Sequence, residues 1–297
     1  MKILLSGASG FIGQSLLKLD KNSLIYRRIN RRNNLSEYNS FFVDNIDKET
    51  VWDGAFDNID CIIHLAGIAH NKSCDKAEIF NTNTYGTIRL AQKAAEAGVK
   101  RFVFVSTAAI GDQKSFNKVK VSFQTQSKYD AELGLKQLAG KVGLEVVIVR
   151  PTLVYGANAP GNFGLLTKLV NKLPLLPFGF SVNKRDFIAV QNLADLLITC
   201  ANHPDAAGHT FLASDGKAVS IKEFTNEIAK GLNKKLIQLP IPVRLMYLAA
   251  RLVGKSDMAE QLLGNLQVDS ANTHEVLGWV PPYTMEQAMS SLSENKK

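Results

Sequence analysis

Short apolar runs of strand length alternate with helical patterns along much of the chain. The first run covers residues 2–6, and a glycine-rich turn follows it before the helical pattern of Leu16, Leu17 and Leu19. The runs are apolar at successive positions, which is typical of strands buried on both faces of a parallel sheet. The same pattern predicts further strands at residues 23–26, 41–43, 61–66, 102–105, 146–149 and 210–213, and helices at residues 87–97, 129–139 and 221–232.

This order of elements predicts an α/β protein with a Rossmann-type, doubly wound parallel sheet and a smaller C-terminal substrate-binding lobe. The NAD(P)-binding domain is predicted at residues 1–150, with a return of the chain to it around residues 184–213. Residues 151–297 are predicted to form mainly the substrate-binding lobe, because prolines and glycines interrupt the candidate elements after Pro151. A chain of 297 residues can hold one large α/β domain or two unequal ones.

Three glycines follow the first predicted strand. Gly7, Gly10 and Gly13 lie between that strand and the first helix. Such a turn leaves unpaired backbone N–H groups at the positive end of the helix dipole, and these groups favour a diphosphate. The glycines allow a tight turn, the approach of the phosphates, and close packing of the helix on the strand. The position of the triplet therefore indicates a nucleotide site rather than a structural turn.

Composition argues against several other classes of protein. Apolar residues make up 45% of the chain and charged residues 21%, as in a globular protein with a substantial core. The net charge is +8, but the basic residues are mostly scattered, so nucleic acid is not an expected partner. The three cysteines form no CxxC pair and the histidines show no ligand spacing, so neither a disulfide nor a metal is expected. We expect a cytoplasmic protein without membrane insertion, because no apolar run has the length of a signal-peptide core or a membrane span.

A basic cluster at the second predicted strand bears on the choice of cofactor. Arg27 and Arg28 stand where this fold usually has an Asp or Glu that binds the ribose 2′-hydroxyl of NAD. A guanidinium can hold a 2′-phosphate with two hydrogen bonds, whereas a carboxylate repels it. The cluster therefore favours NADP(H) as cofactor, with NAD(H) as the alternative.

Several segments together carry a resemblance to a known family. They are GASGFIG at 7–13, HLAG at 64–67, Asn83 with the Gly-Thr pair at 86–87, VKRFVFVST at 99–107, SKYDAE at 127–132, RPTLVYG at 150–156, KRDFIAV at 184–190 and LGWVPPY at 277–283. With these segments the chain resembles the extended short-chain dehydrogenase/reductases of the NAD(P)-dependent epimerase/dehydratase family, which act on nucleotide sugars. The second half contains Asn162-Phe163, LPLLPFG at 173–179, FLASDG at 211–216 and LLGNLQVDS at 262–270. With these segments it is similar to a bacterial O-antigen subgroup related to UDP-galactose 4-epimerases. Members of this subgroup are thought to reduce the 4-keto group of UDP-4-keto-6-deoxy-N-acetylhexosamines.

The resemblance implies roles for individual residues. Together with the glycine turn and the basic cluster, it assigns the cofactor to Gly7, Gly10, Phe11, Ile12, Gly13, Arg27, Arg28, Asp44, Asn45, Leu65, Ala66, Gly67 and Lys128. Substrate contacts are implied for Thr107, Asn162 and Arg185. Asn162 and Arg185 match positions that contact the nucleotide diphosphate, and a guanidinium suits phosphate. A UDP-sugar as substrate and a homodimer are further expectations from the resemblance.

The catalytic positions implied by the resemblance are Thr107, Lys128 and Gln124, and the last of them departs from the family. Hydride arriving at a ketone makes an alkoxide that must take a proton, which the family supplies from a tyrosine four residues before the lysine. The tyrosine and the lysine share a helix face, and the lysine lowers the pKa of the tyrosine. Gln124 can hold a substrate oxygen but cannot deliver a proton near neutral pH. Tyr129 points elsewhere around the helix, and Tyr155 is a candidate proton donor by resemblance only.

Three functional hypotheses follow. The first is NADPH-dependent reduction of the 4-keto group of a UDP-linked deoxy-aminosugar in bacterial surface-polysaccharide (O-antigen) biosynthesis, with water or another group as proton donor. The second is a UDP-sugar 4-epimerase that retains NAD. The arginine cluster argues against this hypothesis. The third is a protein that binds NADP(H) and a sugar nucleotide without turnover, and Gln124 motivates it.

Overall fold

The computed structural model describes residues 1–19, 25–30, 40–69, 74–111 and 121–294, without the side chains of residues 25–28, 30, 257 and 294. The chain divides into two compact units. Unit 1 comprises Met1–Pro151, Leu193–Ala213 and Ser270–Val280, and unit 2 comprises Thr152–Asn192, Ser214–Asp269 and Pro281–Lys297. The segment Ser270–Val280 is a second return to unit 1 that the sequence analysis did not anticipate.

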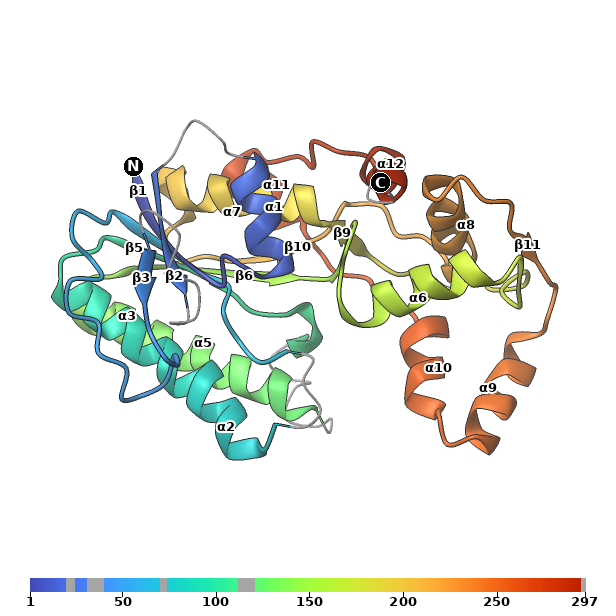
Figure 1. The fold of residues 1–297 in the computed structure, drawn as a ribbon, viewed down its shortest axis with the longest axis horizontal. Helices are drawn as coiled ribbons and strands as arrows, with labels where there is room; N and C mark the ends of the chain where they lie inside the picture. The colour runs from blue at the N-terminus through green and yellow to red at the C-terminus, as the bar shows by residue number, and fades with distance from the viewer. Residues whose placement is uncertain (20–24, 31–39, 70–73, 112–120, 295–297) are drawn as a thin grey trace. The chain divides into compact units, whose positions relative to one another are not determined.

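Unit 1 is built on a parallel sheet of seven strands in the order β10-β6-β5-β4-β1-β2-β3 (Figure 1). Its strands are β1 (Lys2–Ser6), β2 (Ile25–Asn30), β3 (Ser40–Phe42), β4 (Cys61–His64), β5 (Arg101–Val105), β6 (Glu145–Pro151) and β10 (Thr210–Ala213). The strand order reverses between β1 and β4, which is where doubly wound sheets bind a dinucleotide. The predicted α/β class and parallel sheet are confirmed.

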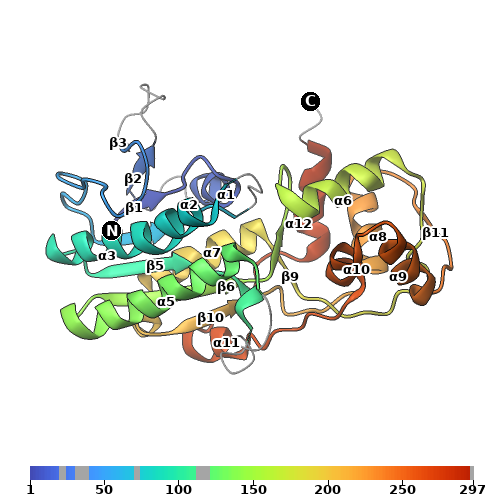
Figure 2. The same ribbon diagram turned by 90° about the horizontal axis from the view of Figure 1, so that it is seen from below.

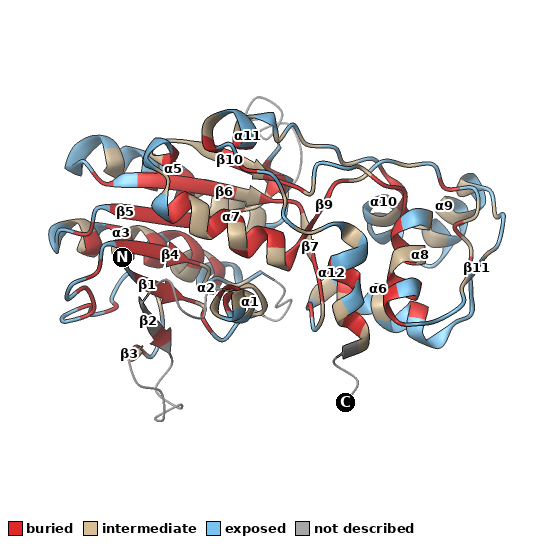
Figure 3. Cartoon of the chain, turned by 90° about the horizontal axis from the view of Figure 1, so that it is seen from above, coloured by how far each residue is buried: buried red, intermediate tan, exposed pale blue. Residues whose placement is uncertain are grey.

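Helices cover both faces of this sheet (Figures 2 and 3). On one face, α3 (Thr87–Glu96) and α5 (Phe123–Val142) bury Leu90 and Leu135 against Ile62 and Phe102 of the strands. On the other face lie α1 (Phe11–Leu19) and α7 (Val190–Asn202). The strands are therefore apolar on both faces, as their composition predicts. The other helical segments that the structure describes in unit 1 are α2 (Lys76–Phe80), the π-helical η1 (Asn81–Gly86), the 3₁₀ turns η2 (Ala108–Ile110) and η3 (Pro204–Ala206), and α11 (Ala271–Leu277).

The second strand continues further than its sequence suggests. The prediction placed Arg27 and Arg28 at the end of this strand, whereas β2 runs to Asn30 and pairs these two arginines with Leu4 and Leu5 of β1. Backbone pairing with β1 extends β2 past the charged side chains. The predicted C-terminal end of this strand was therefore wrong. The side chains of Arg27 and Arg28 lie outside the described residues, and their binding of a 2′-phosphate stays a prediction.

The helix that carries Lys128 begins earlier than predicted. α5 starts at Phe123 instead of residue 129, because Ser122 caps its first turn by accepting a hydrogen bond from Thr125 N. Ser122 is a typical N-cap residue, but the first turn of the helix shows no apolar periodicity from which its start could be predicted. Gln124 and Lys128 therefore both lie within the helix, one turn apart.

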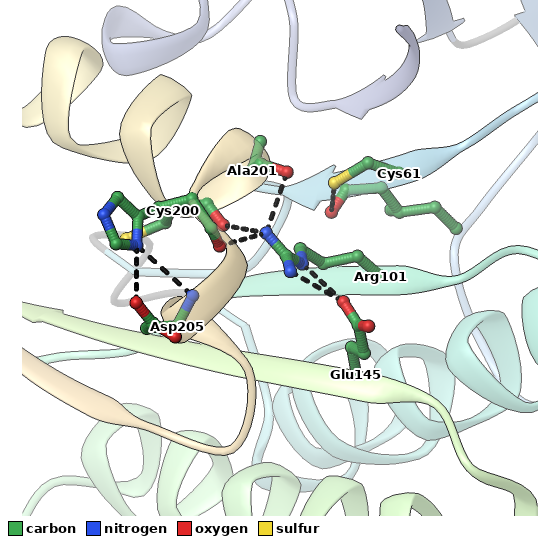
Figure 4. Close-up of polar contacts among 8 residues, drawn as sticks. Cys61, Arg101, Glu145, Cys200, Ala201 and Asp205 are labelled. Atoms are coloured by element: carbon green, nitrogen blue, oxygen red, sulfur yellow. Dashed lines mark hydrogen bonds and ion pairs between the residues drawn. The ribbon is translucent and has the colours of Figure 1, made fainter. Parts of the chain in front are cut away.

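A buried arginine joins the amino ends of β5 and β6 to the end of α7 (Figure 4). Arg101 Nη1 donates to the carbonyl oxygens of Cys200, Ala201 and His203 at 2.7–3.1 Å, and its Nε donates to Glu145 Oε2 at 2.8 Å. The last carbonyls of a helix have no partner within the helix, and a cation there also complements the helix dipole. Arg101 thus fixes α7 against the sheet.

We expect Arg101→Met to lower the free energy of unfolding by about 3–4 kcal/mol, because three buried carbonyls lose their donor. Urea denaturation measures the change. The matched control is Glu145→Gln, since Glu145 is the exposed partner of the pair and its loss is expected to change stability by less than about 1 kcal/mol. Equal losses in the two variants would show that the ion pair, and not the helix cap, is the source of the stability.

The cysteines near Arg101 are free thiols. Cys61 and Cys200 are buried, and burial raises the pKa of each to about 12 although the charge of Arg101 opposes the rise. The third cysteine, Cys74, is also free. Within the described ranges, no group of His, Cys, Asp and Glu residues is arranged to hold a metal ion.

Unit 2 contains two short parallel strand pairs and five helices among its described residues. β7 (Leu153–Tyr155) pairs with β9 (Phe187–Ala189), and β8 (Leu175–Leu176) pairs with β11 (Ile237–Gln238). The helices are α6 (Gly161–Lys172), α8 (Ile221–Gly231), α9 (Val243–Leu252), α10 (Ser256–Leu263) and α12 (Met285–Glu294). Prolines precede α6 and α9 directly, so they begin helices here instead of breaking them. No helix in the described part of the chain is long and apolar enough to cross a membrane.

The core of unit 2 is aromatic. The rings of Phe187 and Phe224 stack with their centroids 3.8 Å apart, and Tyr155 and Phe163 pack against Phe224 at 5.5 and 5.8 Å. All four side chains are buried. This cluster holds β7, β9, α6 and α8 together.

Candidate active site

The turn between β1 and α1 requires glycine at two positions. Gly7 has a φ of 72°, and a Cβ there would lie 2.9 Å from Ala66 N. A Cβ at Gly13 would lie 2.8 Å from Ala8 Cα, so only glycine lets α1 approach the turn this closely. The predicted roles of a tight turn and of close helix packing therefore match the observed geometry.

The same turn presents backbone amides at the start of α1. A Cβ at Gly10 would meet only Gly7 O, at 3.2 Å, so the glycine keeps the concave side of the turn open. The first i to i−4 hydrogen bond of the helix runs from Gln14 N to Gly10 O. The N–H groups of Phe11, Ile12 and Gly13 thus precede the hydrogen-bonded turns and lie at the positive end of the helix dipole. These amides fit the diphosphate of a dinucleotide.

The buried His64 joins β4 to β1 and to α3. Its Nδ1 is 2.6 Å from Ser6 Oγ, and its Nε2 is 2.9 Å from Thr87 Oγ1. Ser6 Oγ also accepts hydrogen bonds from Leu65 N and Ala66 N, so its own hydroxyl proton remains for Nδ1 of His64. His64 is therefore neutral and donates from Nε2 to Thr87. Burial, followed by the charge of Lys128, lowers the pKa of His64 to about 3.

This histidine makes the stability of the fold sensitive to acid. In the unfolded chain His64 is protonated below about pH 6.5, whereas in the folded chain it stays neutral down to about pH 3. The free energy of unfolding therefore keeps its full value above pH 6.5 and decreases as the pH falls from about 6.5 to 3. From pH 6.5 to about pH 5 we expect His64 to remove about 1.5 kcal/mol. Urea denaturation of His64→Gln should lack this loss, whereas the exposed His274→Gln should keep it. The same pH slope in all three proteins would contradict the assignment.

Lys128 and Thr107 meet at the carboxyl end of β5. Lys128 Nζ donates to Val105 O at 3.1 Å and to Ser106 O at 3.2 Å. Thr107 Oγ1 accepts a hydrogen bond from Ala109 N at 3.2 Å, so its hydroxyl proton can point to a substrate oxygen. The fold thus brings two of the three residues predicted to be catalytic to one strand end.

A buried ion pair lies one helical turn beyond Lys128. Glu132 of α5 accepts hydrogen bonds from Arg150 Nε at 2.9 Å and Nη2 at 2.6 Å. Both oxygens of the Glu132 carboxylate bind Arg150. Lys128 donates its hydrogen bonds to backbone carbonyls and not to Glu132. Burial lowers the pKa of Lys128 to about 8, although the charge of Glu132 opposes the shift. The ammonium group is therefore charged at neutral pH but loses its proton in mildly alkaline solution.

Asn83 ties the loop after β4 to α5. Its Oδ1 accepts from Ile68 N at 2.7 Å, and its Nδ2 donates to Ile68 O and to Ser127 Oγ at 3.1 and 3.0 Å. Ser127 Oγ in turn donates to Gln124 O at 3.0 Å. Asn83 lies in the π-helical turn η1, a distortion that is frequent at functional sites. The network sets the position of the helix that carries Gln124 and Lys128.

Gln124 lies half-buried in the first turn of α5, on the face that it shares with Lys128. Neither of the two tyrosines considered from the sequence takes the place of the missing acid. Tyr129 is buried against Ile110 and Val121. Tyr155 is buried and donates its hydroxyl proton to Asp215 Oδ2 at 2.7 Å, and burial, reinforced by Asp215, raises its pKa. This bond speaks against Tyr155 as the proton donor.

The two predicted diphosphate contacts approach one helix of unit 2. Asn162 Nδ2 donates to Gln261 Oε1 of α10 at 3.0 Å, and Arg185 Nη1 donates to Gly264 O, just after α10, at 2.7 Å. Burial lowers the pKa of Arg185, although Glu260 opposes the shift. Since a charge is weakly screened where water is partly excluded, this guanidinium is suited to a diphosphate.

The remaining predicted cofactor residues follow strands of the sheet. Asp44 and Asn45 are exposed just after β3. Leu65, Ala66 and Gly67 follow β4, which ends at His64 and not at residue 66 as predicted, because Leu65 N and Ala66 N turn toward Ser6 Oγ. Their contacts with a dinucleotide stay predictions.

Several residues that shape this site were not among those predicted from the sequence. Ser6 contacts Leu65 and Ala66, and Ser127 contacts Gln124, whereas Glu132 binds Arg150 one helical turn beyond Lys128. Ser6 precedes the glycine turn directly, and Ser127 and Glu132 are the first and last residues of the segment SKYDAE, so their place in or next to a motif is the signal that the sequence offers for them.

The parallel sheet, the amide cradle at its switch point, and Lys128 beside Thr107 define a Rossmann-type dinucleotide-binding protein. Residues 3–213 match the model of the NAD dependent epimerase/dehydratase family. Over 311 residues the chain is 37% identical to a UDP-glucose 4-epimerase from Vibrio cholerae, covering 98% of this chain and 94% of that protein.

Solved structures share the fold. UDP-N-acetylglucosamine 4-epimerase from Bacillus cereus matches with a TM-score of 0.79 at 20% identity, over 99% of both chains. RMD from Pseudomonas aeruginosa, solved in complex with NADPH, matches with a TM-score of 0.72 at 19% identity, over 99% of this chain and 98% of that one. The chain belongs to the NAD dependent epimerase/dehydratase family, as the sequence motifs predicted, and it is an enzyme of that family.

Proposed function

We propose that the protein uses NADPH to reduce the 4-keto group of a UDP-linked deoxy-aminosugar. The observation that carries the proposal is the arrangement at the carboxyl end of β5, where Lys128 bonds to Val105 O close to Thr107. Gln124 lies one helical turn before Lys128, where the resemblance leads us to expect a tyrosine. The proposal retains the cofactor and the ketone that the motifs suggest, and it changes only the source of the proton.

Thr107, Gln124 and Lys128 have separate roles in the proposed reduction. NADPH, when bound at the glycine turn, would be the source of the hydride for C4 of the sugar. Thr107 donates a hydrogen bond to the oxygen of the ketone, and the carboxamide of Gln124 can donate a second. Lys128 would bind the nicotinamide ribose, and its charge would stabilise the alkoxide. Because an alkoxide is strongly basic, it can take its proton from water.

Gln124 favours net reduction over epimerisation. A 4-epimerase must first oxidise C4, and this step needs a base for the proton of the 4-hydroxyl. A carboxamide cannot serve as that base near neutral pH. Reduction needs only a proton for an alkoxide. Arg27 and Arg28 support the same choice, since a reductase requires an exchangeable cofactor.

A UDP-sugar 4-epimerase is the second candidate. One observation favours it, namely the 37% identity with a protein named UDP-glucose 4-epimerase. The two candidates differ in their cofactor balance, because reduction consumes one NADPH for each sugar and epimerisation consumes none.

The deciding experiment follows NADPH absorbance and sugar products together. With a UDP-4-keto-6-deoxy-N-acetylhexosamine, we expect stoichiometric loss of NADPH and a 4-hydroxy product. With UDP-glucose or UDP-N-acetylglucosamine, we expect no interconversion with the galacto epimer. Epimer formation without loss of NADPH would replace the proposal by the second candidate. Binding of NADP(H) without turnover of either substrate would contradict both.

A further inference from the structure

Helix α9 exposes a stripe of leucines. Among its described residues none is buried, and Leu245, Leu248 and Leu252 are 55%, 55% and 80% exposed. These positions are spaced i, i+3 and i+7, so the three side chains lie along one face of the helix. A continuous apolar stripe of this kind on the surface marks a contact with something outside the chain.

The opposite face of α9 packs on α10. Tyr247, which lies across the helix from the stripe, donates from its hydroxyl to Glu260 Oε2 of α10 at 2.9 Å. Further contacts join α9 to α10. The leucine stripe therefore faces away from the neighbouring helix.

Two arginines border the stripe. Arg244 and Arg251 are exposed and lie seven residues apart on α9, which places them along one edge of the leucine stripe, and the exposed Lys255 follows shortly after the helix ends at Leu252. An amphipathic helix with an apolar face and flanking cations is the usual form of a helix that lies in a membrane interface. The aliphatic stems of such residues cover apolar surface while their charges reach the lipid headgroups.

We propose that α9 docks the protein on an anionic phospholipid surface. The cations complement the negative headgroups, and the net charge of +8 attracts the whole chain to them. Few apolar side chains of α9 are exposed, so the attraction of the cations to the headgroups has to contribute to binding. Docking is therefore peripheral and reversible, and it depends on anionic lipid.

The docking helix is connected to the predicted diphosphate contacts within unit 2. α9 bonds to α10 through Tyr247 and Glu260, and α10 receives the hydrogen bond of Asn162 through Gln261. A membrane-bound α9 would thus hold Asn162 and Arg185 close to the lipid surface. The docking itself does not depend on the reaction proposed above.

Sedimentation with lipid vesicles tests the proposal. The full chain should bind vesicles of phosphatidylcholine with one quarter phosphatidylglycerol, and it should remain in solution with pure phosphatidylcholine. The double variant Leu248→Ser, Leu252→Ser should bind at least about 100-fold more weakly, because two leucines no longer leave water. Arg244→Gln should weaken binding about fivefold and make it less sensitive to salt. The matched control is Leu165→Ser, Leu169→Ser, which removes two exposed leucines of α6 and should bind as the parent does.

The substituted leucines are exposed, so their variants should fold, and circular dichroism checks this. As a second readout, Leu248→Trp should show a blue-shifted emission with the anionic vesicles. Failure of the parent chain to bind them, or equal losses in the α6 and α9 double variants, would overturn the proposal. It would also be overturned if the α9 double variant converted a dimer to a monomer in sedimentation equilibrium, since a second copy would then cover the stripe.

Discussion

Gln124→Tyr is expected to raise the rate constant of ketone reduction by about 10²–10⁴-fold, the usual contribution of a positioned general acid. The new phenol would lie one helical turn before Lys128, on the same face of α5. The charge of Lys128 would lower the pKa of the phenol and ready its proton for the alkoxide. Since Gln124 is only half-buried, the helix has room for the larger ring.

The measurement is kcat for NADPH-dependent reduction at saturating substrate. Gln124→Phe is the matched control, because it adds the ring without the hydroxyl and should give no gain. An equal gain in both variants would assign the effect to packing. No gain in Gln124→Tyr would show that the native proton donor lies elsewhere and already suffices.

The features that depend on local chemistry could be predicted from the sequence. The buried strands are apolar at successive positions, so their existence and parallel order followed from composition. Gly7 and Gly13 are required by a positive φ and a close helix approach, which is why their spacing identified the turn. The homodimer, the cytoplasmic location and the choice of NADP(H) over NAD(H) stay predictions.

The features that depend on tertiary contacts could not be predicted. The start of α5 depends on the capping of its first turn by Ser122, and the polar residues there give no apolar periodicity to recognise. The bond between Tyr155 and Asp215 joins residues sixty positions apart, so no spacing reveals that the tyrosine is occupied. Likewise, Ser6 and His64 meet only because β1 and β4 are neighbours in the sheet.

The candidate site also shows where stability and function compete. Lys128 has a pKa of about 8 in the fold and 10.5 as a free side chain, so below pH 8 the fold bears the full penalty of a buried charge. This penalty is on the order of 3 kcal/mol and disappears as the pH rises from about 8 to 10.5. The unbound protein keeps an unfavourable charge at the position where the reaction needs one, which is expected of a functional residue.

Lys128→Met should therefore separate the two properties. We expect kcat/KM for reduction to fall by about 10²–10³-fold, because the charge that stabilises the alkoxide is gone. In the parent enzyme, kcat/KM should fall as the pH rises through about 8, and the residual activity of the variant should lack this transition. The control is Lys136→Met, on an exposed position of the same helix, which should keep both activity and pH profile.

Urea denaturation supplies the second half of the test. From pH 8 to 10.5 the parent should gain stability relative to Lys128→Met, by up to roughly 3 kcal/mol, because only the parent loses a buried charge in that range. A variant that is inactive and also gains or loses stability equally at every pH would assign Lys128 a structural role. An inactive variant with the expected pH-dependent difference would establish that the ammonium charge is kept for catalysis at the expense of the fold.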